Sequence, residues 1–70
     1  MNIIGINVRK IRESKAWTQE QLVAKCHLAK WDISRGTLAK IESKVRRVTD
    51  IEVKTLSIIL NVPVGSLFND

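Results

Sequence analysis

Residues 17–42, with the sequence WTQEQLVAKCHLAKWDISRGTLAKIE, contain the two helix starts that decide the fold. Thr18 and Gln21 have the spacing of a capping box, in which each side chain accepts a hydrogen bond from a backbone N–H group that the first helical turn leaves free. Apolar residues follow the box at helical spacing. The pattern predicts a helix that begins at residue 19 and ends at about residue 26.

A second helix start lies near the other end of this stretch. Ser34 is a residue type that caps helices, because its hydroxyl oxygen accepts a hydrogen bond from the first turn. Leu38 and Ile41 then supply apolar side chains at helical spacing. We expect a helix over residues 35–43.

The segment between these two helices, residues 27–32, contains neither glycine nor proline. The first helix can therefore continue into it, or an additional turn can follow. Trp31 lies in this segment, where it either covers the end of the helix or anchors a partner. The sequence leaves these alternatives open.

Helical patterns on either side extend the prediction to the whole chain. Ile4, Val8 and Ile11 recur at helical spacing, and Thr49 with Glu52 forms a second capping box. No stretch alternates polar and apolar residues with the period of a strand. The sequence therefore predicts one all-α domain. Its remaining elements are helices over residues 3–15 and 50–60 and a last helical turn over residues 64–68, and the domain covers residues 1–70.

Charge is unevenly distributed along the chain. The 70 residues include 12 Lys and Arg against 7 Asp and Glu, a net charge of +5. Residues 1–47 hold eleven of these cations and four of the acids, a net +7, whereas residues 48–70 hold one cation and three acids, a net −2. This asymmetry indicates a face that binds a polyanion, although a solvated cationic surface has the same composition.

Several classes of function find no support in the sequence. Cys26 and His27 are the only residues of their types, so a disulfide within the chain is excluded and no set of metal ligands is present. No catalytic triad or glycine-rich phosphate loop is recognisable, and we expect no enzymatic activity, no metal and no cofactor. No apolar run approaches the ~20 residues that cross a bilayer, and no signal peptide is evident. We therefore expect a cytoplasmic protein that does not contact membranes.

Three stretches of the chain resemble the phage repressor/Cro-type helix-turn-helix family. They are WTQEQL at residues 17–22, ISRGTLAKIE at residues 33–42 and NVPVGSLF at residues 61–68, and the second is the most specific. The resemblance extends from Gly5 to Phe68. It implies a compact, lambda-repressor-like bundle of five helices in which the second and third form the helix-turn-helix. The chain departs from the family at residues 27–32, where family members commonly have a shorter turn that often contains glycine.

The resemblance also implies how such a domain binds its partners. Family members commonly bind double-stranded DNA as dimers, with the third helix in the major groove. The implied base contacts are Arg35, Gly36, Ala39 and Lys40. The implied phosphate contacts are Gln19, Ser34, Thr37 and the loop after the third helix. Arg12 and Glu42 would form a structural ion pair between the first helix and the end of the third.

The residue types suit these roles on chemical grounds. Arginine is the best reader of guanine, because its guanidinium binds O6 and N7 together, so Arg35 fits a base contact. Gly36 and Ala39 are small enough to let the helix lie deep in a groove, and Ala39 can contact a thymine methyl group. Loop cations neutralise phosphates, and free backbone N–H groups at a helix start can bind another phosphate. The phosphate contacts expected on these grounds are Thr18, Gln19, Lys44, Arg46 and Arg47. Each residue can alternatively be an ordinary solvated surface residue.

The predicted helix over residues 50–60 has apolar residues on two faces. One face fits the core, whereas Ile51 and Ile58, a heptad apart, lie nearly opposite to it. Exposed isoleucines in a small domain indicate an interface, although scattered apolar residues are common on surfaces. The predicted homodimer face consists of Ile51, Thr55, Ile58, Ile59 and Phe68.

These observations together predict a sequence-specific DNA-binding transcriptional repressor that acts as a homodimer. Repression would be steric, because 70 residues leave no room for a ligand-sensing domain. One alternative is the antitoxin of a toxin–antitoxin pair, which would bind a toxin protein as well as DNA. The other is a protein-interaction module on the same helical scaffold, which would bind no DNA.

Overall fold

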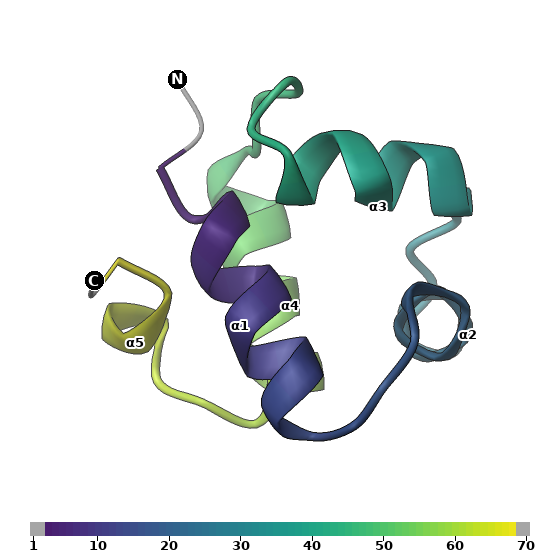
Figure 1. The fold of residues 1–70 in the computed structure, drawn as a ribbon, viewed down its shortest axis with the longest axis horizontal. Coiled ribbons are helices and arrows are strands. Elements are labelled where there is room, and N and C mark those ends of the chain that lie inside the picture. The colour runs from purple at the N-terminus through teal and green to yellow at the C-terminus, as the bar shows by residue number, and fades with distance from the viewer. Residues whose placement is uncertain (1–2, 69–70) are drawn as a thin grey trace.

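The computed structural model describes residues 3–68, which form five α-helices and no strand (Figure 1). The prediction of an all-α helix-turn-helix bundle is confirmed. The first three helices differ from their predicted bounds by one or two residues at an end, whereas the last two begin and end as predicted. The helices are α1 (Gly5–Ser14), α2 (Gln19–Leu28), α3 (Arg35–Glu42), α4 (Asp50–Leu60) and α5 (Val64–Phe68).

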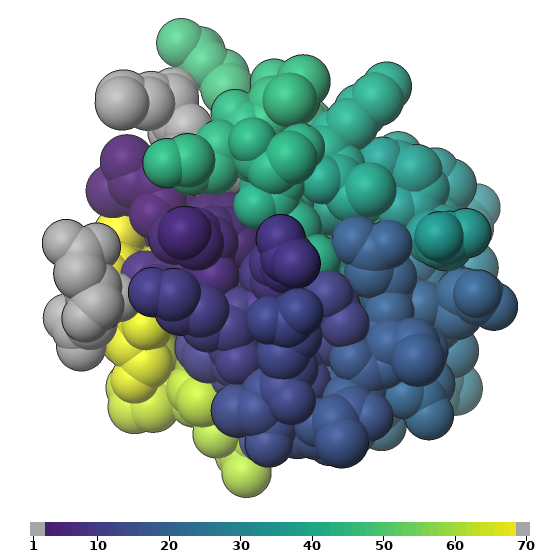
Figure 2. Space-filling view, viewed as in Figure 1, coloured from purple at the N-terminus to yellow at the C-terminus, as the bar shows by residue number. Residues whose placement is uncertain are grey.

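A single apolar core joins these helices. In Figure 1, α1 crosses in front of α4 at the centre, with α3 above them, α2 to one side and α5 to the other. Helix α1 contacts α3, α4 and α5, and α2 contacts α3 and α4. Figure 2 shows the α2 and α3 residues, in blue and teal, as neighbouring parts of one surface. The buried core consists of Ile4, Val8, Leu22, Cys26, Ile33, Leu38, Ile41, Leu56, Leu60 and Leu67.

The three predicted N-caps are present in the structure. Thr18 Oγ1 accepts from Gln21 N at 3.1 Å and Gln21 Oε1 accepts from Thr18 N at 2.7 Å, which completes the capping box of α2. Thr49 and Glu52 form the same arrangement at α4. Ser34 caps α3 by accepting from the backbone N–H of its third residue at 3.1 Å. These caps fix where each helix begins.

Four helices end in the same way, and the sequence gives little sign of it. The first residue after α4, and the second residue after each of α1, α2 and α3, has a left-handed backbone, and two hydrogen bonds run back to the last turn, as in a Schellman motif. Glycine usually occupies such a position, because other residues pay ~1 kcal/mol or more for positive φ. Here no glycine has positive φ. The left-handed residues are Ala16, Lys30, Lys44 and Asn61, with φ of 59°, 63°, 67° and 57°.

The segment between α2 and α3 combines both alternatives that the sequence left open. Helix α2 continues to Leu28, and Lys30 then turns the chain. The backbone N–H of Trp31 donates to the Cys26 carbonyl at 2.9 Å, and the Trp31 side chain packs against the core. His27 Nε2 donates to the Ile33 carbonyl at 2.7 Å. Trp31 therefore covers the end of α2, and the turn is held without glycine.

Candidate nucleic-acid interface

The outer face of α3 carries the four residues predicted to contact bases. Arg35, Gly36 and Lys40 are exposed and Ala39 is half-buried. On the opposite face, Leu38 and Ile41 are buried in the core. Positions 35, 36, 39 and 40 lie on one side of a helix because they are separated by about one turn. The helix thus presents two cations and two small residues to solvent.

A cleft of about 570 Å³ lies beside this face, where α1, the start of α2 and α3 meet. A neighbouring hollow of about 300 Å³ is lined by Gln19, Arg35, Gly36 and Ala39. Arg9, which the sequence pattern did not single out, lines the larger cleft from α1, and its Nε lies 3.3 Å from Glu13 Oε2. Only the packing of α1 against α3 brings Arg9 here, so no local sequence signal could have found it.

Arg12 and Glu42 join α1 to the end of α3 beneath this cleft. Arg12 Nε donates to Glu42 Oε2 at 2.7 Å and Nη2 donates to Oε1 at 3.1 Å. Their side chains are only 9% and 3% exposed, and Arg12 Nη1 also donates to the Trp17 carbonyl at 2.6 Å. Hydrogen bonding to Glu42 raises the pKa of Arg12 above its ordinary value. The charge-assisted hydrogen bonds between Arg12 and Glu42 therefore fix the two helices relative to each other.

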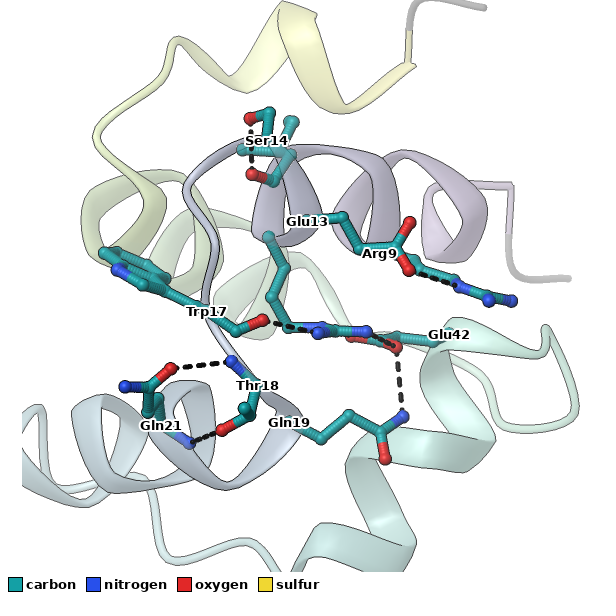
Figure 3. Close-up of polar contacts among 10 residues, drawn as sticks. Arg9, Glu13, Ser14, Trp17, Thr18, Gln19, Gln21 and Glu42 are labelled. Carbon is teal, nitrogen blue, oxygen red and sulfur yellow. Dashed lines mark hydrogen bonds and ion pairs between the residues drawn. The ribbon is translucent and has the colours of Figure 1, made fainter.

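Gln19 belongs to the same network, as Figure 3 shows. Its Nε2 donates to Glu42 Oε1 at 3.1 Å. Gln19 was predicted to contact a phosphate, and its side-chain amide here ties the start of α2 to the end of α3. Three helices consequently meet at one buried carboxylate.

Thr18, Ser34 and Thr37 use their hydroxyl groups in caps. Thr18 caps α2, and the Ser34 and Thr37 hydroxyls lie 3.1 Å apart at the start of α3. Thr18 and Ser34 are exposed, whereas Thr37 is half-buried. These side chains are fixed at the two helix starts that border the outer face of α3.

The loop after α3 contains the three remaining predicted phosphate contacts. Lys44 and Arg47 are exposed. Arg46 instead forms a fork with Glu52, with Nη1–Oε1 at 3.0 Å and Nη2–Oε2 at 2.9 Å. Hydrogen bonding from Arg46 is the main cause that holds the pKa of Glu52 below its ordinary value. The sequence pattern identified Glu52 only as a cap residue and missed this pairing.

The residues predicted for the homodimer face lie on α4 and α5 with different exposures. Ile51 is 79% exposed, Ile58 68% and Phe68 46%. Thr55 is half-buried and donates its hydroxyl to the Ile51 carbonyl at 2.9 Å. Ile59 packs against the core of its own chain, which leaves less of it for a partner. The exposed apolar surface of α4 is therefore centred on Ile51 and Ile58.

Cys26 offers no reactive group on the surface. The side chain is buried, and burial raises the pKa of its thiol to about 11. The thiol therefore remains protonated at neutral pH. Among residues 3–68, no three His, Cys, Asp or Glu side chains converge as metal ligands, and no helix is long and apolar enough to cross a bilayer.

Comparison with known families identifies this arrangement. Residues 8–67 match the family model described as helix-turn-helix, which covers 60 of the 70 residues. The chain belongs to the Cro/C1-type helix-turn-helix family. Members of this helix-turn-helix family are DNA-binding transcriptional regulators, and the chain is one of them. No curated protein and no solved structure shows significant similarity to the chain.

Proposed function

We propose that this helix-turn-helix protein is a sequence-specific transcriptional repressor that reads the major groove with the outer face of α3. The observation that carries the proposal is that exposed Arg35, Gly36 and Lys40 and half-buried Ala39 share one outer face, beside a cleft at the start of α2. A major groove about 12 Å wide admits one helix, and base edges within it are read by such side chains. Arg35 is assigned to guanine, and Lys40 to a base edge one turn further along the helix.

Gly36 supports close approach of this face to a ligand. A Cβ built at Gly36 would meet only Ser34 Oγ, at an ordinary distance of 3.7 Å, and the residue has no positive φ. The fold therefore does not require glycine at this position, the second residue of α3, where alanine would lose less backbone entropy on folding. A base pair or sugar lying against the helix supplies a reason for the missing side chain.

The phosphate contacts are assigned to groups on both sides of α3. Lys44 and Arg47 supply cations from the following loop, and the first backbone N–H groups of α2 at Gln19 supply partial positive charge. Arg9 adds a cation from α1 across the cleft. Arg46 is assigned chiefly to holding the loop through Glu52.

The homodimer is assigned to the exposed isoleucines of α4. Ile51 and Ile58 form an apolar surface on the acidic last part of the chain, which DNA does not attract. A dimer through this face would place two α3 helices on two half-sites and block access of other proteins to the DNA. The double variant Ile51→Glu/Ile58→Glu should sediment as a monomer, and sedimentation unchanged from the wild type would refute this interface.

Selection of bound duplexes from a random pool tests DNA reading directly. A defined site with two symmetric halves supports the proposal, and recovery of unrelated sequences contradicts it. On the selected site, Arg35→Ala should cost ~1–3 kcal/mol of binding free energy and relax the preference at one base pair. An equal loss of affinity for the selected duplex and for random duplex would show that Arg35 does not read a base.

Gly36→Ala gives a test with opposite signs for folding and binding. The free energy of unfolding, measured by urea titration, should rise by up to ~1 kcal/mol. The affinity for the selected duplex should fall. Gly65→Ala in α5 is the matched control, because a Cβ there meets nothing within 4 Å and the residue lies away from α3. Unchanged DNA affinity of Gly36→Ala would show that α3 does not approach DNA closely at this position.

A further inference from the structure

A groove on the outer face of α2 lies apart from the proposed DNA contacts. It encloses about 290 Å³ and is lined by Trp17, Gln21, Ala24, Lys25 and Leu28, and we call it the α2 groove. Residues 21, 24, 25 and 28 recur at helical spacing, so they form one stripe along α2. Leu22 and Cys26 on the opposite side of the helix are buried in the core. None of the five lining residues borders the clefts beside α3.

Three of the five lining residues, Trp17, Ala24 and Leu28, are apolar. Leu28 is 84% exposed, more than any other large hydrophobic side chain in residues 3–68. Ala24 beside it is exposed as well, and half-buried Trp17 forms the far wall. An exposed Leu28 beside Ala24 and Trp17, along a hollow that Gln21 and Lys25 also line, suits an apolar side chain of a partner better than water.

The charges around the α2 groove specify what can enter it. Lys25 Nζ lies 4.4 Å from the centre of the Trp17 ring, and Lys15 Nζ lies 5.4 Å from it. No acidic residue lines the groove, and Glu20 borders the cleft on the other side of α2. An entering segment therefore meets two ammonium groups with no carboxylate in the lining, so acidic residues on that segment complement the site.

We propose that the α2 groove docks an acidic amphipathic peptide segment of another protein, with an apolar side chain against Leu28 and Ala24 and a carboxylate at Lys25. Nucleic acid would satisfy the lysines but leave Leu28 uncovered, which favours a protein segment. The start of α2 borders the DNA cleft and Leu28 ends the helix, so the groove stays accessible while α3 is in the major groove. The regulator can thus hold a protein partner and its DNA site at the same time.

A selection from a random displayed-peptide library against the full chain tests the proposal. Enriched peptides should combine Asp or Glu with Leu, Ile or Phe at helical spacing. The affinity of one synthesised peptide is then measured by calorimetry against variants of the chain. Leu28→Ser should weaken binding by about tenfold or more, whereas Val45→Ser, an equally solvent-exposed apolar residue in the loop after α3, should change it less than about twofold.

Charge variants test the electrostatic half of the same site. Lys25→Gln should weaken binding of the peptide, whereas Lys54→Gln on α4 should leave it unchanged. Each variant removes one cation that is exposed or half-exposed. Ala24→Glu adds a carboxylate to the groove and should abolish binding without disturbing the core, because Ala24 is exposed. Circular dichroism checks that each variant is folded.

Four results would overturn the proposal: no enriched peptide, enriched peptides without acids, equal affinity for Leu28→Ser, or displacement of the peptide by random duplex. The last result would place the groove in the DNA interface. DNA binding is measured separately on the selected duplex, and Leu28→Ser should leave it unchanged. Loss of the peptide site would therefore leave the proposed repressor function standing, and loss of sequence-specific DNA binding would leave the peptide result standing.

Discussion

Two arginine–glutamate pairs lie near the C-terminal end of α3, and they have different structural roles. Arg12 and Glu42 lie 30 residues apart in sequence, are almost fully buried and join α1 to α3, with Gln19 of α2 on the same carboxylate. Arg46 and Glu52 lie 6 residues apart, remain 34% and 15% exposed, and fold a loop onto the cap of α4. One pair thus fixes the tertiary position of α3, whereas the other shapes the segment that follows it.

Breaking the buried pair should give the largest effect. Glu42→Gln leaves the Arg12 guanidinium buried without its carboxylate, and removal of one partner of a buried pair typically costs about 3–5 kcal/mol. Urea unfolding followed by circular dichroism measures the loss. The double variant Arg12→Met/Glu42→Leu should be more stable than Glu42→Gln, because it removes both buried charges. Wild-type stability of Glu42→Gln would mean that the pair does not hold α1 and α3 together.

Arg46 of the half-buried pair can be compared with the neighbouring exposed Arg47 in DNA binding. Arg47→Gln should lower the slope of log affinity against log salt by about 0.9, the value for one lost phosphate contact, and leave stability unchanged. Arg46→Gln should lower stability by ~1 kcal/mol or less and leave that slope unchanged, because Arg46 is paired with Glu52. A slope for Arg46→Gln that falls as it does for Arg47→Gln would restore Arg46 to the phosphate contacts expected from the sequence.

The left-handed residue of the loop allows a matched pair of glycine substitutions. Lys44→Gly and Lys30→Gly should each raise the free energy of unfolding by about 0.5–1 kcal/mol, because glycine adopts positive φ without a Cβ penalty. Lys44→Gly should also weaken DNA binding, since it removes a cation beside α3, whereas Lys30→Gly should not. Filter-retention measurements of DNA affinity at two salt concentrations separate the effect on DNA binding from the effect on stability. Equal DNA affinity of both variants would remove Lys44 from the interface.

Acidification should weaken the Arg46–Glu52 pair, with the smallest of the expected effects. Hydrogen bonding from Arg46 lowers the pKa of Glu52 below its ordinary value of 4.5. The Glu52 carboxylate therefore contributes stability that is complete above pH 4.5 and is lost as the pH falls through its lowered pKa. Wild-type protein should lose stability below pH 4.5 more steeply than Glu52→Gln or Arg46→Gln in parallel urea titrations. Identical pH profiles would show that the fork contributes nothing to folding.

The three capped helix starts were predictable from the sequence, whereas the left-handed turns after α1, α2 and α3 were not. Thr18, Ser34 and Thr49 carry their signal locally, because a cap involves residues three positions apart. Lys30 and Lys44 carry no such signal at the ends, since glycine is the usual residue for the conformation that they adopt. The sequence therefore does not predict the conformation of the turn after α2.

The residues of the candidate interface likewise differ in how far the sequence predicts them. The outer face of α3 follows from helical spacing and from the family resemblance, which also implied the Arg12–Glu42 pair. Arg9 in the cleft and the Arg46–Glu52 fork depend on how α1 and the loop pack, which spacing in the sequence does not encode. The hydrogen bond from Gln19 to Glu42 is missed for the same reason, because the two residues lie 23 positions apart in the sequence.

The two tryptophans give this protein intrinsic optical reporters at both ends of α2. Trp17 and Trp31 each follow a left-handed residue, one where α1 ends and the other where α2 ends. Indole emission responds to nearby charge and to water, and Trp17 has two lysine ammonium groups beside its ring. The single-tryptophan forms Trp31→Phe and Trp17→Phe would therefore report separately, without an attached dye, on events at the start of α2 and at the turn into α3.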